Sequence, residues 1–99
     1  MQYDREGFVD AADGSRLFYE EMGEGDPPVV LTDGRGCDGF AWRYLAPRLA
    51  QHHRVVHWHF CGHGRSGPPV YCKRLSIENL AGDLRRICDE LGIERPVIA

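Results

Sequence analysis

Metal-binding side chains cluster in residues 54–67, RVVHWHFCGHGRSG. Imidazole and thiolate groups are ligands that zinc prefers, and His57 and His59, two residues apart on a strand, would face the same side. Packing and local hydrogen bonding at the end of a strand explain the pattern more simply than a metal site does. We therefore expect no metal: ligand atoms of His57, His59, Cys61 and His63 should not lie within about 2.0–2.3 Å of one centre.

Two serines, Ser15 and Ser66, have the side-chain chemistry of a nucleophile. The pattern Gly-x-Ser-x-Gly is typical of a hydrolase nucleophile, because it places the serine on a sharp turn between a strand and a helix. Neither Ser15 nor Ser66 has this context, because residue 17 is Leu and residue 68 is Pro. Ser66 is instead predicted to cap or brace its turn through its hydroxyl group.

Glycine-rich loops suggest a second chemistry. Residues 34–39, GRGCDG, have the GxGxxG spacing of dinucleotide-binding turns, after a predicted strand and before a predicted helix. Such a site needs an acidic residue about 20 positions later, where this chain has His57-Trp58-His59. Residues 62–67, GHGRSG, fit the pattern too, so it is weakly specific. Nucleotide binding stays an alternative, and no cofactor is expected.

The predicted elements begin with a β-hairpin over residues 7–21. Two runs, 7–11 and 16–21, flank Asp13-Gly14, and Asp-Gly between alternating runs is a strong hairpin signal. The second run alternates weakly, which suggests an exposed strand near a sheet edge.

Residues 28–58 predict a right-handed βαβ unit. The continuous apolar runs 28–32 and 54–58 are typical of buried, parallel strands. The helix between them is expected at 41–50, and Pro47 would kink it or make it start late. Its expected apolar face comprises Trp42, Leu45, Leu49 and Ala50.

A longer helix is predicted over residues 76–91, capped by Ser76. Gly92 suits the left-handed position after the helix, and residues 96–99 begin a further strand. The predicted buried stripe is Leu80, Leu84, Ile87 and Leu91 with Ala81 and Cys88 beside it, and the predicted solvated face is Asp83, Arg85, Arg86, Asp89 and Glu90.

Composition excludes several classes of protein. The 99 residues allow one domain or part of one, and 42% hydrophobic with 27% charged residues fit a soluble globular chain. A net charge of −3 without a dense basic run argues against nucleic acid, and no apolar run approaches the roughly 20 residues of a membrane span. The charged N-terminus does not resemble a signal peptide, so a cytoplasmic location is expected. The four cysteines, Cys37, Cys61, Cys72 and Cys88, are expected to be reduced thiols.

Several motifs in a fixed order resemble the N-terminal portion of an α/β-hydrolase. Residues 31–34, LTDG, stand at its first loop, Trp42 on its helix, and residues 62–67 at its Gly-His-Gly-x-Ser turn. Residues 91–97, LGIERPV, resemble the approach to the nucleophile elbow. The fold implied is a hairpin followed by β-α-β-α-β with parallel strands, forming a partial domain over 1–99. Residues 54–58 would then pair between the hairpin and residues 28–32.

The resemblance also implies an incomplete active site. The backbone N–H of Arg35, after Gly34, would be one donor of the oxyanion hole. Asp33 stands where the family usually has His, and His59 where it usually has Asp; both would adjoin the active site. The nucleophile, the acid and the catalytic His are expected beyond Ala99, so no catalytic residue is assigned in this chain.

The function implied is that of a serine-type hydrolase acting on an ester or related small molecule through the complete protein. These 99 residues alone are expected to be inactive. The first alternative is a non-catalytic α/β binding module, and the second is a metal- or nucleotide-binding domain. The strand begun at residues 96–99 would leave an open sheet edge, through which self-association is possible.

Overall fold

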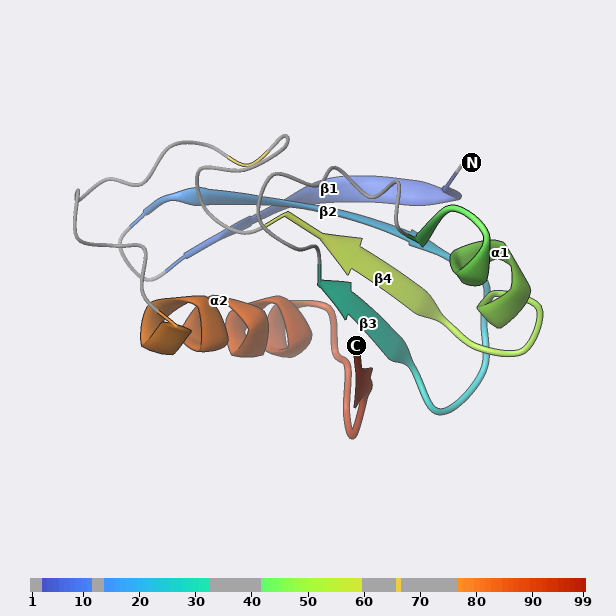
Figure 1. Ribbon diagram of the computed structural model, residues 1–99. Helices are drawn as coiled ribbons and strands as arrows, with labels where there is room; N and C mark the ends of the chain where they lie inside the picture. The colour runs from blue at the N-terminus through green and yellow to red at the C-terminus, as the bar shows by residue number, and fades with distance from the viewer. Residues whose placement is uncertain (1–2, 12–13, 33–41, 60–65, 67–76) are drawn as a thin grey trace.

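The computed structural model describes residues 3–11, 14–32, 42–59, 66 and 77–99. These residues form a five-stranded mixed sheet with two helices (Figure 1). The strands are β1 (Arg5–Asp10), β2 (Arg16–Met22), β3 (Val29–Thr32), β4 (Val55–Trp58) and β5 (Val97–Ile98), and the helices are α1 (Leu45–Leu49) and α2 (Ile77–Glu90). Neither described helix has the length and apolarity that a membrane crossing requires.

The strand order is β1-β2-β4-β3-β5. β1 and β2 form the predicted antiparallel hairpin, β2 pairs antiparallel with β4, and β3 pairs in parallel with both β4 and β5. The predicted position of residues 54–58, between the hairpin and residues 28–32, is confirmed. The prediction of an exposed β2 is wrong, since Leu17 and Phe18 are buried and β1 occupies the edge.

The face of the sheet beneath α2 carries the larger core. Val30, Val56 and Trp58 pack there with Ile87 and Cys88 of the helix. The predicted stripe is confirmed in part: Leu80, Leu84 and Leu91 are only partly buried, and Ala81 is exposed. Gly92 takes the predicted left-handed conformation, with φ of +66°. The predicted cap, Ser76, lies outside the described residues.

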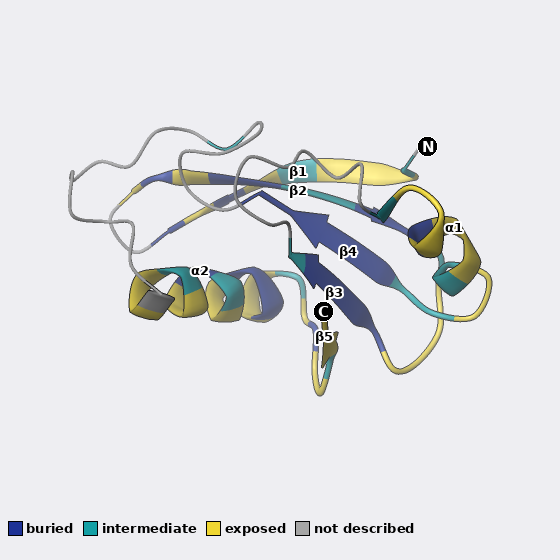
Figure 2. Ribbon diagram, in the orientation of Figure 1, coloured by how far each residue is buried: buried dark blue, intermediate teal, exposed yellow. Residues whose placement is uncertain are grey.

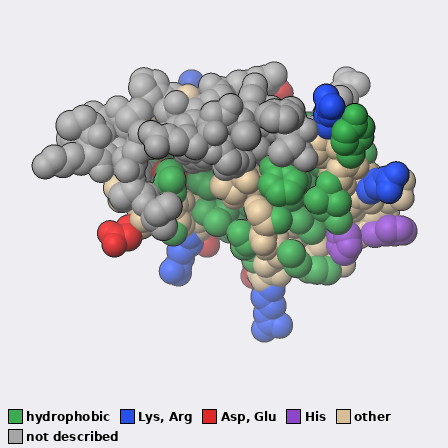
Figure 3. Space-filling model, in the orientation of Figure 1, with side chains coloured by type: hydrophobic (Ala, Val, Ile, Leu, Met, Phe, Trp, Pro, Cys, Tyr) green, Lys and Arg blue, Asp and Glu red, His purple; other side chains and the backbone are tan. Residues whose placement is uncertain are grey.

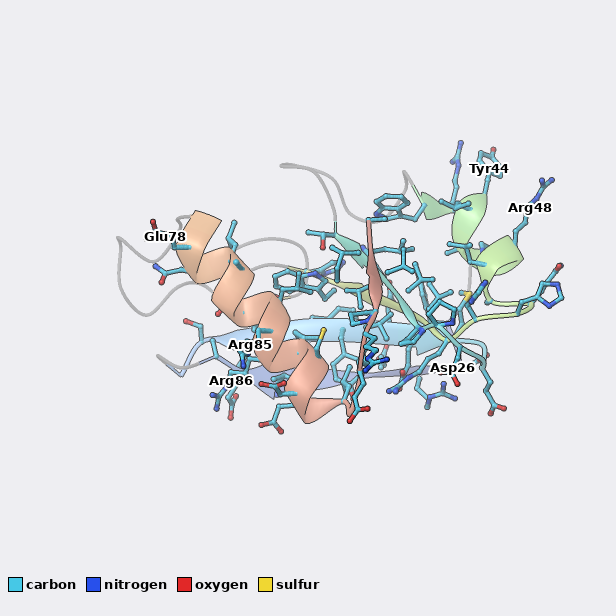
Figure 4. The ribbon with its side chains drawn as sticks, turned by 90° about the horizontal axis from the view of Figure 1, so that it is seen from below. Asp26, Tyr44, Arg48, Glu78, Arg85 and Arg86 are labelled. Atoms are coloured by element: carbon cyan, nitrogen blue, oxygen red, sulfur yellow. The ribbon has the colours of Figure 1, made fainter. Side chains whose placement is uncertain are left out.

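Asp83 corrects the predicted solvated face of α2. Its residue exposure is 2%, whereas Arg85, Arg86, Asp89 and Glu90 are exposed. A helix docked on a twisted sheet buries more than its apolar stripe, because neighbouring positions lie within the contact area. Figure 4 shows Arg85 and Arg86 on α2, where the guanidinium of Arg86 donates a hydrogen bond to the Asp10 carbonyl of β1.

The opposite face packs against α1, which is shorter than the predicted helix over 41–50. Helix α1 begins at Leu45, so Pro47 falls in its first turn, where a missing backbone N–H does no harm. This late start changes which residues face the sheet: Ala46 is fully buried, whereas Leu45 is 44% exposed. The small core on this face comprises Met22, Val29, Leu31, Ala46 and Val55, with Trp42, Leu49 and Ala50 packed beside it.

Burial follows these layers. Figure 2 shows β3 and β4 as buried, whereas β5 and the outer side of α2 are exposed. Strands covered on both faces need apolar side chains in consecutive positions, and the runs VVL and VV satisfy this requirement.

Two glycines give opposite predictions for substitution by alanine. Gly25 has a φ of +127°, and a Cβ there would lie 2.0 Å from the His52 carbonyl oxygen. We expect Gly25→Ala to lower the free energy of unfolding by about 1–3 kcal/mol, because the backbone would have to move. Gly82→Ala, inside α2 with open space around it, should raise it by about 0.5–1 kcal/mol. Urea unfolding followed by circular dichroism measures both, and equal effects would contradict the prediction.

Candidate functional site

The carboxyl ends of β3 and β5 lie side by side. The Thr32 N–H donates a hydrogen bond to the Ala99 carbonyl at 2.9 Å, and the Ala99 N–H donates one to the Val30 carbonyl at 2.9 Å. In open α/β sheets, ligands bind at this edge of the parallel strands. Asp33, Gly34 and Arg35, which follow β3 in the sequence, lie outside the described residues, so the predicted oxyanion role of Gly34-Arg35 stays a prediction.

Ser66 joins the hairpin to the end of β4. Its Oγ accepts a hydrogen bond from the Phe18 N–H at 2.8 Å and donates one to the His59 carbonyl. The His59 N–H in turn donates to the Phe18 carbonyl at 3.0 Å. Ser66 therefore continues the β2–β4 ladder beyond Trp58, which confirms the predicted bracing role and gives its hydroxyl a structural task.

One carboxylate and two imidazoles meet on β2 and β4. Glu20 is the cross-strand partner of His57, and His57 Nδ1 lies 3.0 Å from Glu20 Oε1. His59 is buried directly after β4, and the His57 and His59 ring centroids are 5.0 Å apart. One candidate ligand atom from each of these three residues lies within 4.8 Å of the others.

Sequence reasoning missed Glu20. It lies 37 positions before His57, and only the register of two antiparallel strands brings the side chains together. The four-residue metal hypothesis included Cys61 and His63, both of which lie outside the described residues. His57 and His59 are brought together as their spacing predicts.

Aromatic rings enclose the two histidines. The Tyr3 ring stacks on His57 with centroids 6.1 Å apart, and the Phe18 ring lies 5.1 Å from that of His59. Phe8 contacts Phe18 edge-on, at 5.6 Å between centroids. The His57 side chain is fully buried, while that of Glu20 keeps 18% of its surface exposed.

An ion-pair network centred on one buried carboxylate lies on the other face of the sheet. Glu21, with a side chain only 7% exposed, accepts hydrogen bonds from Arg54 at 2.8 Å and from Arg5 at 3.1 Å. Arg54 also donates to the Leu91 carbonyl just after α2, at 3.1 Å. Burial raises the pKa of Glu21, but the hydrogen bonds and charges of Arg54 and Arg5 outweigh it and hold the pKa below its usual value.

The thiol of Cys88 is free and buried between α2 and the sheet. Burial, with a smaller contribution from the charge of Asp89, raises the pKa of this thiol, which makes it a weak nucleophile. Cys37, Cys61 and Cys72 lie outside the described residues.

The surface around α1 is polar and aromatic. Tyr44 and Arg48 project from the α1 region away from the sheet (Figure 4).

On the face seen in Figure 3, hydrophobic side chains gather in the middle of the molecule. Val97 and Ile98 of the edge strand β5 are about half exposed, at 49% and 51%.

The model of the α/β-hydrolase fold family matches residues 27–99 of this chain. The matched residues include both parallel strands of the βαβ unit, α2 and β5. The chain belongs to the α/β-hydrolase fold family.

Curated relatives are hydrolases and receptors of greater length. The chain is 37% identical over 92 residues to bifunctional epoxide hydrolase 2 of Sus scrofa, a match that covers 92% of this chain and 16% of that protein. It is 35% identical over 83 residues to the putative carbamate hydrolase RutD of Azorhizobium caulinodans, covering 84% of this chain and 30% of the relative. The chain thus spans less than a third of either relative.

Solved structures agree with the fold. A putative aryl esterase from Burkholderia cenocepacia superposes with a TM-score of 0.85 and 30% identity, over 95% of this chain and 36% of that chain. An epoxide hydrolase from an endophytic Streptomyces gives a TM-score of 0.84 and 27% identity, over 95% of this chain and 28% of that one.

Proposed function

We propose that this chain forms the oxyanion-loop side of the active site of a serine-type hydrolase. The supporting observation is the hydrogen-bonded contact between the ends of β3 and β5. By resemblance, the loop after β3 supplies one oxyanion donor, and the segment after β5 carries the nucleophile. The two segments then start from adjacent points at the ligand-binding edge of the sheet.

The proposed reaction is nucleophilic attack on an ester or related small molecule. In acyl transfer, the carbonyl oxygen gains negative charge, and preorganised backbone N–H donors stabilise that charge by a few kcal/mol. The Arg35 N–H would supply one of these donors. The relatives named as epoxide hydrolase, carbamate hydrolase and esterase support hydrolysis as the reaction type, and the bond cleaved is left general.

The same proposal assigns no catalytic residue to these 99 residues. A serine-hydrolase site needs a nucleophile, a His base and an orienting acid. Gly-x-Ser-x-Gly does not occur in the sequence, and the Ser66 hydroxyl is engaged between Phe18 and His59. A small-molecule substrate, no nucleic-acid partner and self-association through the β5 edge complete the proposal.

A non-catalytic binding module is the second candidate. It is favoured by the 36% identity, over 75 residues, to a protein named karrikin insensitive 2 receptor IA from Petunia hybrida. A receptor and a hydrolase can share one fold, because function depends on the site and not on the scaffold.

Turnover of p-nitrophenyl acetate tests the assignment. We expect residues 1–99 to release p-nitrophenol no faster than their Ser66→Ala variant does, because the triad is missing. We also expect the reading frame after the Ala99 codon to encode Gly-x-Ser-x-Gly within about ten residues, and the longer protein to be active.

Two outcomes would contradict this proposal. Turnover by residues 1–99 that Ser66→Ala abolishes would show that the nucleophile is misplaced. A stop codon directly after Ala99, with a folded product that lacks turnover, would favour the binding module.

A further inference from the structure

The group formed by Glu20, His57 and His59 has the composition of a metal site. The β2–β4 register makes Glu20 the neighbour of His57, and His59 lies two residues further along the chain, so the three side chains share one face of the sheet. One carboxylate with two imidazoles is a known zinc ligand set. Hard cations such as Ca²⁺ and Mg²⁺ prefer oxygen ligands instead.

We infer that Glu20, His57 and His59 bind a divalent transition-metal ion of the zinc type. Ligand atoms about 2.0–2.2 Å from one tetrahedral zinc ion lie about 3.3–3.6 Å from one another. The candidate atoms already lie within 4.8 Å of one another. Closing the site therefore needs these atoms to approach one another by up to about 1.5 Å, through torsional adjustment of the partly exposed Glu20 side chain and of the imidazole rings.

The surroundings of the three side chains favour binding of a metal ion, because they hold the imidazoles in place and limit their hydration. The side chains of His57 and His59 are buried, and the rings of Tyr3 and Phe18 restrict their rotation. The Glu20 carboxylate beside them is only partly exposed, and a divalent cation would compensate its charge. Three protein ligands leave a fourth position of the tetrahedron open for water or a small ligand.

The inference replaces the sequence-based expectation that this stretch holds no metal. That expectation concerned ligands from one strand and the turn after it. The structure adds an anionic ligand from a second strand, and with it a third ligand atom on a rigid sheet. The site does not depend on the proposed hydrolase activity.

Zinc titration with a competing chelator tests the site. We expect the chain to bind one Zn²⁺, and Glu20→Gln and His59→Asn each to weaken the affinity at least roughly 100-fold. Loss of a residue that merely orients a ligand weakens metal affinity about 10–100-fold, so loss of a ligand should exceed that range. His52→Gln removes an exposed imidazole and is the matched control, which should bind zinc as the unmodified chain does.

X-ray absorption on the zinc-loaded, unmodified chain keeps the test independent of variant folding. We expect scattering from two imidazoles, Zn–N distances of about 2.0–2.1 Å, and no sulfur at about 2.3 Å. Sulfur scattering, loss of binding in His52→Gln, or the absence of stoichiometric zinc would each overturn the inference.

Discussion

Replacing Trp58 by alanine is expected to lower the free energy of unfolding by about 3–5 kcal/mol. The Trp58 side chain is almost fully buried against Val56 and Ile87, and its indole N–H donates to Thr32 Oγ1 at 2.8 Å. Alanine would leave a cavity between β4 and α2 and a hydroxyl without its donor. Because small domains are stable by only about 5–15 kcal/mol, this loss brings the chain close to unfolding.

A second substitution at Trp58 separates the hydrogen bond from ring packing, and a substitution at Trp42 serves as a comparison. Trp58→Phe keeps most of the ring and loses the hydrogen bond, so the expected loss is about 1–2 kcal/mol. Trp42→Ala removes a tryptophan that is only partly buried beside the α1 core, and should cost less than Trp58→Ala. Urea unfolding followed by circular dichroism gives all three values. A loss at Trp42 that equals the loss at Trp58 would contradict this account of the core.

Neutralising Glu21 is the second large expected effect. Glu21→Gln should lower the free energy of unfolding by about 2–3 kcal/mol at pH 7, because it leaves the Arg5 and Arg54 guanidinium groups without their carboxylate. We place the value below that of a fully buried pair because the side chains of Arg5 and Arg54 are 49% and 28% exposed. The network links β1, β2 and the end of α2, so its loss should loosen all three.

Glu21 also predicts how stability changes with pH. Its pKa is lowered in the folded chain, so below the ordinary value of about 4.3 the unfolded chain binds a proton that the folded chain does not. The contribution of Glu21 is therefore complete above that value and is lost as the pH falls through the lowered, folded pKa. Free energies of unfolding measured from pH 7 to pH 3 should fall less steeply for Glu21→Gln than for the unmodified chain.

The matched control is Glu90→Gln, which removes an exposed carboxylate from α2. It should change the free energy of unfolding by less than about 0.5 kcal/mol and leave the acid-side slope unchanged. A Glu21→Gln slope equal to that of the control would show that the arginines do not hold this carboxylate in its charged form.

Local patterns were sufficient for the elements and their order. Asp13-Gly14 between alternating runs predicted the hairpin, and continuous apolar runs predicted β3 and β4. Pro47 predicted either a kink or a late start of the helix, and the structure shows the late start. Each signal acts within a few residues of chain, through allowed φ values, missing donors or alternation, and needs no knowledge of distant contacts. Short right-handed connections then limit how such elements can pair.

Which polar side chains are buried was decided by the tertiary structure. Asp83 looks like a surface residue along the helix, and it is buried because docking on a twisted sheet sets the rotation of α2. Ala46, not Leu45, faces the core because the starting point of α1 sets its rotation. Periodicity identifies a face of a helix, but packing sets how far that face extends.

Sequence patterns could not predict the two polar networks, around Glu20 and around Glu21, for one shared physical reason. Glu20 meets His57, and Glu21 meets Arg54, across a β2–β4 register that joins residues more than 30 positions apart. A slip of one residue would send each side chain to the opposite face, so no local pattern encodes these pairs. The sequence by itself determined the elements, and its resemblance to the α/β-hydrolases predicted the order of the strands; the register of two strands decided which charges and imidazoles meet.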